Sequence, residues 1–238
     1  MFGRNCMIIG KIVASESHIS YVGQIFGPGE VEAPPASCDY AFGRFVCCPI
    51  HHGNPPGTVS SADAAPAPGS PERVSTSVIG VIYDTRLLNP AFGTLGPRLS
   101  TEAQTTLFTP DYVAETTVLV SVITLGIMEL CLEPNPVSRP DVVSITQGIP
   151  APALGLGSLL ETMSDEDVRA FHYFGQPGEA PRLHLEYLPH VIAQRHSLLG
   201  LLALNIIDQL ERLFADQATI LSIIKRNFAW RLKIESTR

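Results

Sequence analysis

Charged residues are scarce in this sequence of 238 residues, because Asp, Glu, Lys and Arg together make up only 16% of it. Soluble domains carry about 25% of charged residues. Hydrophobic residues make up 45% of the chain, so we expect it to fold around a sizeable core and not to be disordered as a whole. The net charge of -7 argues against a broadly basic nucleic-acid binder but permits a local basic patch.

The sequence also lacks an uninterrupted apolar run of the roughly 20 residues that a membrane-spanning helix requires. The best candidates are Val118–Leu132, which is interrupted by Glu129, and Leu198–Ile207, which contains Asn205. The N-terminus has no basic segment followed by an apolar core and a cleavage site of small residues. We therefore expect a cytoplasmic protein that does not associate with membranes.

Cysteine is too rare for a disulfide-stabilised scaffold, since five cysteines are a small and odd number. We expect reduced and mostly buried thiols. The segment Cys47–His52 combines two cysteines with two histidines. On an extended strand each pair is divided between opposite faces, so one tetrahedral zinc ion could use all four only after a sharp turn at Pro49. A buried strand end is the favoured interpretation; zinc binding and a redox-active thiol pair are the alternatives.

The N-terminal half has the composition of β-strands. β-Branched and aromatic residues dominate five runs, some of which contain the glycines that suit bends in a small barrel. The runs are Cys6–Val13, Ile19–Phe26, Tyr40–Cys48, Ser77–Asp84 and Thr116–Gly126. A closed barrel removes the exposed edges that an open sheet would leave. The runs show little alternation of polar and apolar residues, as expected where both faces of a strand are partly covered.

Two proline-rich segments divide the chain. Residues 49–73 combine proline with alanine, serine and glycine, and predict a disordered insertion in the barrel. Residues 134–157 predict a linker rich in proline and glycine. We thus expect an α+β protein, in which residues 1–133 form a small β-barrel and residues 158–238 form a mixed, mainly helical C-terminal region.

Helical signals dominate this C-terminal region. Ser164 is placed to cap a short acidic helix that runs to about Phe174, and Leu183–Leu188 alternates like a strand. From residue 191 to residue 227 apolar residues recur at intervals of three, four or seven, which indicates a helix. The last segment, Phe228–Glu235, alternates at every second position and predicts a strand. We expect Trp230, within it, to be buried.

The periodic segment presents an apolar face of about seven helical turns. Its residues are Leu199, Leu202, Ile206, Leu210, Leu213, Ile220 and Ile224. At about 25 cal/mol per Å² of apolar surface, leaving half of this face in water would cost on the order of several kcal/mol. Either the barrel or another subunit must cover it. We expect a homo-oligomer or a protein partner, with these residues as the interaction site.

The last fourteen residues differ in charge from the acidic remainder. They contain one acidic residue, Glu235, and five basic residues, so their net charge is +4. The basic residues are Lys225, Arg226, Arg231, Lys233 and Arg238. Such a basic tip suits a nucleic acid or an acidic partner surface. It equally suits the C-terminal end of a helix, where the helix dipole favours cations.

Two stretches of the sequence together resemble a known family. Gly10–Ser15 opens and Ile79–Asp84 closes a barrel similar to the HAS barrel, the N-terminal β-barrel shared by HerA-type DNA translocases and rotary ATP synthase subunits. A proline-rich connector, Gln147–Pro150, the acidic helix, the strand-like segment and Gln194–Gly200 then follow in the order of HerA-like proteins. The resemblance covers residues 1–200 and implies a barrel that arranges subunits into rings and docks partners.

The sequence departs from that family where a nucleotide would bind. A phosphate-binding loop needs several glycines, a lysine that reaches the phosphates and a Ser or Thr for magnesium. Here Gly200 is followed by Leu201–Ile206, which contains none of these. ATPase activity is therefore not carried over, and we predict no catalytic residue, no cofactor and no metal.

The function predicted from the sequence is a non-catalytic interaction and assembly module. One alternative is a degenerate HerA-like ATPase, and another is an accessory factor of nucleic-acid processing. The accessory factor would bind nucleic acid through Lys225, Arg226, Arg231 and Lys233.

Overall fold

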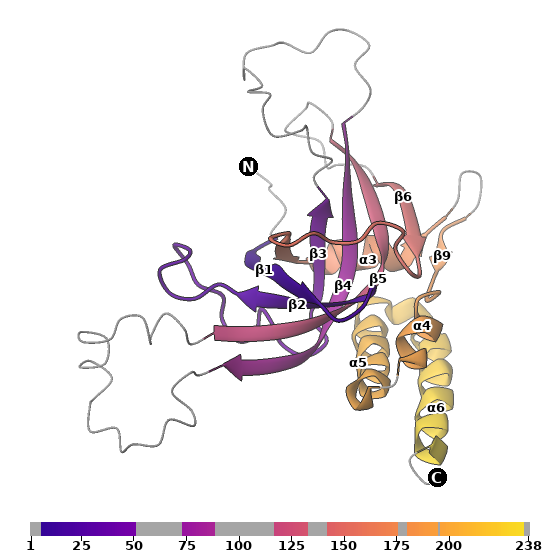
Figure 1. The fold of residues 1–238 in the computed structure, drawn as a ribbon. Helices are drawn as coiled ribbons and strands as arrows, with labels where there is room; N and C mark the ends of the chain where they lie inside the picture. Colours follow the sequence, from indigo (N-terminus) through magenta and orange to yellow (C-terminus); the bar gives the residue numbers. More distant parts are fainter. Residues whose placement is uncertain are drawn as a thin grey trace, which may run out of the picture.

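The computed structural model describes residues 6–50, 73–88, 117–132, 142–175, 180–194 and 196–235. In chain order its elements are β1 (Ile8–Ser15), β2 (Ser20–Ile25), β3 (Phe45–Ile50), β4 (Arg73–Leu88), β5 (Thr117–Leu132), β6 (Val142–Gln147), β7 (Leu159–Thr162), α3 (Asp165–His172), β8 (Tyr173–Phe174), β9 (Arg182–Leu183), α4 (Leu188–Ala193), α5 (Ser197–Leu213), the 3₁₀ turn η1 (Ala215–Gln217) and α6 (Ala218–Glu235). Figure 1 shows these helices on one side of a β-barrel. No helix among these residues combines the length and apolar character needed to cross a membrane.

Six of the strands close into a barrel. Hydrogen-bonded neighbours follow the order β2-β1-β7-β3-β4-β5, and β2 pairs with β5 to complete the ring. β6 pairs with β5 on the edge of the sheet outside the ring. The α+β architecture with an N-terminal β-barrel is therefore confirmed.

The limits of the barrel differ from those predicted. Residues 142–147, expected in a linker, form β6 against β5. Residues 159–162, expected in the C-terminal region, form β7 between β1 and β3. The prolines around β6 hid its β-branched run, and four residues of β7 are too few to show a strand pattern. Of the predicted insertion, residues 51–72 lie outside the described part of the chain.

The strands that face the helices are buried on both sides. Successive residues of a strand point to opposite faces. In β3, Val46 and Cys48 point into the barrel, whereas Phe45 and Cys47 point outward to the helices. The barrel interior is filled by Ile9, Ile12, Tyr21, Ile25, Val46, Cys48, Ile82, Val120, Val122 and Leu160. Burial of both faces is the reason that polar and apolar residues do not alternate.

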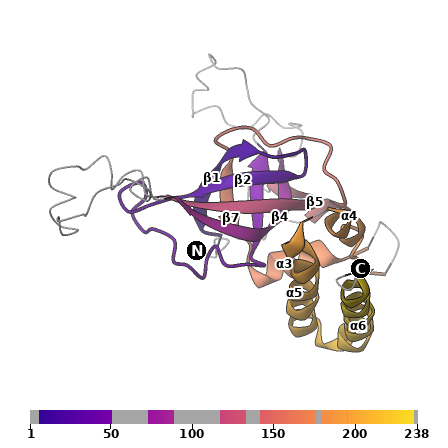
Figure 2. The same ribbon diagram turned by 60° about the horizontal axis from the view of Figure 1, so that its bottom comes forward.

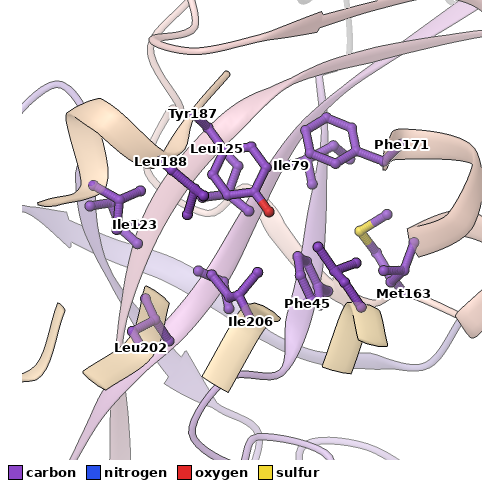
Figure 3. Close-up of a cluster of buried hydrophobic side chains, with 14 of the residues drawn as sticks. Phe45, Ile79, Ile123, Leu125, Met163, Phe171, Tyr187, Leu188, Leu202 and Ile206 are labelled. Atoms are coloured by element: carbon purple, nitrogen blue, oxygen red, sulfur yellow. The ribbon is translucent and has the colours of Figure 1, made fainter. Parts of the chain in front are cut away.

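A second apolar cluster joins the barrel to the helices. Figure 3 shows Ile79 and Leu125 on β4 and β5, with Leu202 and Ile206 of α5 facing them. All four side chains are fully buried. In Figure 2, α3, α5 and α4 lie against one side of the barrel, and α6 lies farther out, against α5.

Helix α3 begins as the sequence predicts. The Ser164 hydroxyl accepts a hydrogen bond from the Asp167 backbone N–H, and the Asp167 carboxylate accepts one from the Ser164 backbone N–H. This reciprocal capping box satisfies two donors of the helix N-terminus. The helix ends at His172, because the next two residues form β8.

Two strand predictions for the C-terminal region are wrong. In the segment 183–188, only Leu183 belongs to a strand, and Leu188 begins α4. The segment 228–235 is helical, as the last part of α6. Its inward residues Phe228 and Leu232 are four positions apart and pack towards α5, so the tertiary contact selects the helix over the strand.

His172 and Tyr187 form a buried polar pair within the second cluster. Neither side chain is exposed. The ring Nδ1–H of His172 donates to the Val168 carbonyl oxygen at 2.7 Å, and Nε2 accepts from the Tyr187 hydroxyl at 2.7 Å. The carbonyl oxygen can only accept, so Nδ1 carries a proton, and in the neutral ring Nε2 is then the acceptor. Burial, which disfavours the charged ring, lowers the pKa of His172 to about 4.

We predict that the protein loses stability as the pH falls from about 6.5 towards 4. Below its ordinary pKa of 6.5, His172 takes up a proton in the unfolded chain, but in the folded protein it stays neutral down to about 4. Proton uptake therefore favours the unfolded chain across this window, by on the order of 3 kcal/mol in total.

Urea denaturation at a series of pH values measures this loss. A His172→Phe/Tyr187→Phe double variant, which removes the pair together, should show a shallower dependence of the unfolding free energy on pH. The control is His18→Gln, because the side chain of His18 is exposed. If the double variant keeps the slope of the wild-type protein, His172 is not its source.

Candidate interaction surface

The apolar face predicted for one long helix is divided between α5 and α6. Four of its residues lie against the barrel and are at most 3% exposed: Leu199, Leu202, Ile206 and Leu210. Within the described structure they are packed inside the second cluster, with residues of β4, β5, α3 and α4, and so they are not on the exposed surface. Leu213 and Ile224 are partly buried at the margin of the same cluster. Ile220 is 54% exposed and is the member of the predicted set that remains open.

Helix α6 is anchored along one side. Leu221 is fully buried, and Phe228 packs partly buried against the same cluster. Farther along the helix, Leu232 lies so close to Gly200 of α5 that a Cβ atom at position 200 would come within 2.5 Å of a Leu232 methyl group. A glycine at position 200 therefore permits the close packing of the two helices.

Lys225 adds a polar contact between the two helices. Its ammonium group forms ion pairs with Asp208 and, at 3.4 Å, with Glu211 of α5. The hydrogen bond to Asp208 is the main cause that raises the pKa of Lys225 above its ordinary value. Lys233 also has an interaction within the chain. Two of the four predicted nucleic-acid contacts are thus engaged by the protein itself.

The opposite side of α6 exposes large apolar side chains. Ile220, Ile223 and Trp230 are 54%, 47% and 66% exposed. At 3.6 residues per turn, positions 220, 223, 227 and 230 form one stripe along the helix. The prediction that Trp230 is buried is wrong, because Leu221, Phe228 and the other anchoring positions lie on the far side of the helix.

A shallow hollow of about 390 Å³ lies beside this stripe. It is lined by Ile224, Asn227, Phe228, Trp230 and Arg231. Arg226 and Arg231 are exposed, and neither forms an ion pair with another residue in the described ranges. We call Ile220, Ile223, Arg226, Trp230 and Arg231 the α6 outer face. The sequence spacing of Ile220, Ile223 and Trp230 was the available signal for it.

The cysteine residues of β3 have the environment of structural thiols. Cys47 and Cys48 are buried on opposite faces of the strand, as predicted. Burial, with a smaller effect of Glu161, raises the pKa of Cys48 to about 12, so its thiol is not a ready nucleophile. The two histidines of the predicted Cys-His cluster lie outside the described residues. Within the described residues, no group of three or more His, Cys, Asp or Glu side chains is placed to hold a metal ion.

A protein family described as Domain of unknown function (DUF8166) matches residues 2–53 and 71–237. The chain belongs to this family. The match includes the barrel strands and the helical hairpin, in which α5 and α6 are joined by the turn η1 and pack against each other. It passes over residues 54–70, which fall within the predicted insertion at 49–73. No curated protein matches the chain.

We predict that the same substitution is far more destabilising on α5 than on the α6 outer face. Ile206→Asp places a charge in the fully buried contact with the barrel and should cost on the order of 4 kcal/mol or prevent folding. Ile223→Asp should change the unfolding free energy by less than about 0.5 kcal/mol, since the side chain is half exposed. Urea unfolding followed by circular dichroism measures both. A similar large loss in the two variants would contradict the assignment of Ile223 to an open surface.

Proposed function

We propose that this chain is a non-catalytic protein-interaction module, in which a HAS-like barrel carries the hairpin of α5 and α6 and the α6 outer face binds a partner protein. The observation that carries the proposal is the exposure of Ile220, Ile223 and Trp230 on one stripe of one helix. Exposed apolar side chains that gather on one face of a helix are typical of interaction sites. The polar Asn227 lies between Ile223 and Trp230 in this row. Tryptophan and arginine are also the residues that dominate binding hot spots.

The structure at the start of α5 supports a role without nucleotide binding. Gly200 lies inside the helix with Leu232 packed against it, and Leu202 is in the core. A phosphate-binding loop instead presents free backbone N–H groups that wrap around the phosphates. The ring Nδ1 of His196 accepts a hydrogen bond from the Leu198 N–H at 3.3 Å and so caps the helix. Residues that precede a phosphate site in HerA-like proteins thus have a structural role here.

An accessory role on nucleic acid has weaker support. Binding to phosphates needs a row of available cations. Lys225 is engaged by Asp208 and Glu211, and the exposed Arg226 and Arg231 lie beside isoleucine and tryptophan side chains.

We predict that the protein does not bind ATP. Titration with a fluorescent ATP analogue and magnesium should give no saturable change in anisotropy, because residues 200–206 are packed within a helix. Saturable binding that a substitution of Asn205 abolishes would instead support the degenerate ATPase.

The interaction role itself is tested by a photo-crosslinking amino acid at position 223, in cells that express the protein naturally. We expect a discrete adduct with a protein, identified by mass spectrometry, and we expect Trp230→Asp to suppress it. The control position is 85, because Thr85 is exposed on the end of β4 that lies away from α6 (Figure 1). An adduct with a second copy of the chain also supports an interaction role. Labelling no stronger than at position 85, or an adduct with nucleic acid alone, would overturn it.

A further inference from the structure

We infer that the α6 outer face receives an amphipathic helix of another protein, with acidic residues on both edges of the apolar stripe of that helix. The inference rests on the proposed interaction role and adds the chemistry of the partner. It follows from the length of the exposed stripe, the hollow beside it and the position of two arginines.

The length of the stripe fits a short helix. From Ile220 to Trp230 the helix rises by about 15 Å, or about three turns. A partner helix of that length places apolar residues at intervals of three and four along the same line. The hollow between Phe228, Ile224 and Trp230 offers a place for one large apolar side chain of the partner.

The stripe also continues the existing packing of the hairpin. Ile224 and Phe228 are half-buried against the second core cluster, and at the same time they line the hollow. Helix α5 therefore covers only part of the apolar surface of α6, and Ile224 and Phe228 lie at the edge of the covered part. An added helix would extend the same helix-on-helix packing and would remove Ile223 and Trp230 from water.

The two arginines define the charge of the partner. At about 100° per residue, Arg226 and Arg231 fall on opposite sides of the line through Ile223 and Trp230. Both are exposed and have no ion pair within the described ranges. A helix that lies on the stripe therefore brings its two edges to these guanidinium groups. Carboxylates on those edges would form charge-assisted hydrogen bonds with them.

The same charges disfavour two other occupants. If α6 of a second copy lay antiparallel on this face, the two Arg226 side chains would meet on one edge near the centre, and like charges brought together across an interface are unfavourable. A nucleic acid could neutralise the two arginines, but its phosphates would leave Ile220, Ile223 and Trp230 without an apolar partner. An acidic amphipathic helix satisfies the apolar and the charged groups together.

The experiment uses the full chain and three fluorescent probes. Two are designed helical peptides of about 15 residues with the same leucine stripe, one flanked by glutamates and the other by lysines. The third is a single-stranded DNA oligonucleotide. Fluorescence anisotropy gives the affinities, and the emission of Trp230 reports on this face directly, because it is the single tryptophan of the chain.

The glutamate peptide should bind and shift the Trp230 emission to shorter wavelength, whereas the lysine peptide should bind at least about tenfold more weakly. An Arg226→Glu/Arg231→Glu double variant should reverse this preference. Ile223→Asp should abolish binding of the glutamate peptide. Arg212→Glu is the matched control, since Arg212 is an exposed arginine of α5 outside the α6 outer face, and it should leave the preference unchanged.

Equal affinity for the two peptides, or a preference that the double variant leaves unchanged, would overturn the inference. Tighter binding of the DNA than of the glutamate peptide would also overturn it. If the glutamate peptide does not bind but an adduct forms at position 223 with a second copy of the chain, the inference fails while the interaction role stands. If neither the peptide nor any protein engages position 223, both fail.

Discussion

The apolar contact between α5 and the outer faces of β4 and β5 holds the molecule together. Ile79 and Leu125 would stand in water on a free barrel, and Leu202 and Ile206 would do so on a free helix. Each such side chain contributes about 1.5–3 kcal/mol when it is buried, against a net stability of about 5–15 kcal/mol for a typical domain. The barrel and the helices therefore form one cooperative unit, although the sequence predicts two separate regions, a β-barrel and a mainly helical C-terminal region.

Helix α5 is fixed by polar contacts as well as by apolar ones. The Gln209 side-chain amide donates to the Gly43 carbonyl oxygen at 2.8 Å and to the Asn205 side-chain oxygen at 2.7 Å. Gly43 has a φ of 82°, a conformation that glycine adopts without strain, and a Cβ atom there would collide with Asn205. These contacts hold α5 at one rotation on the barrel. Since α6 packs on α5 through Leu232 and Gly200, the rotation of α5 also sets the direction in which the α6 outer face points.

The sequence predicts an element well where local chemistry decides it. The capping box at Ser164 and the β-branched run before Asp84 each indicate their element without help from the rest of the chain. Periodicity shows that Leu202 is buried, but not whether a strand of the same chain or a second subunit covers it. Only the path of the chain decides that. The wrong prediction for Trp230 has a related cause: the alternation around it is equally compatible with a strand, and the contact of Leu232 with Gly200 of α5 favours the helix.

The position of β7 has a consequence for the synthesis of the protein. Met7 and Thr162 lie 155 residues apart, yet the Met7 backbone N–H donates to the Thr162 hydroxyl at the seam where β1 meets β7. The barrel cannot close until residue 162 has emerged from the ribosome. Contacts between residues so far apart in the sequence also form slowly. Until then β1 and β3 each lack the neighbour that β7 supplies, and open strand edges of this kind pair readily with other chains. The nascent chain thus has open barrel edges, which favour aggregation and capture by chaperones, during the interval in which most of the barrel has been made but its last strand has not.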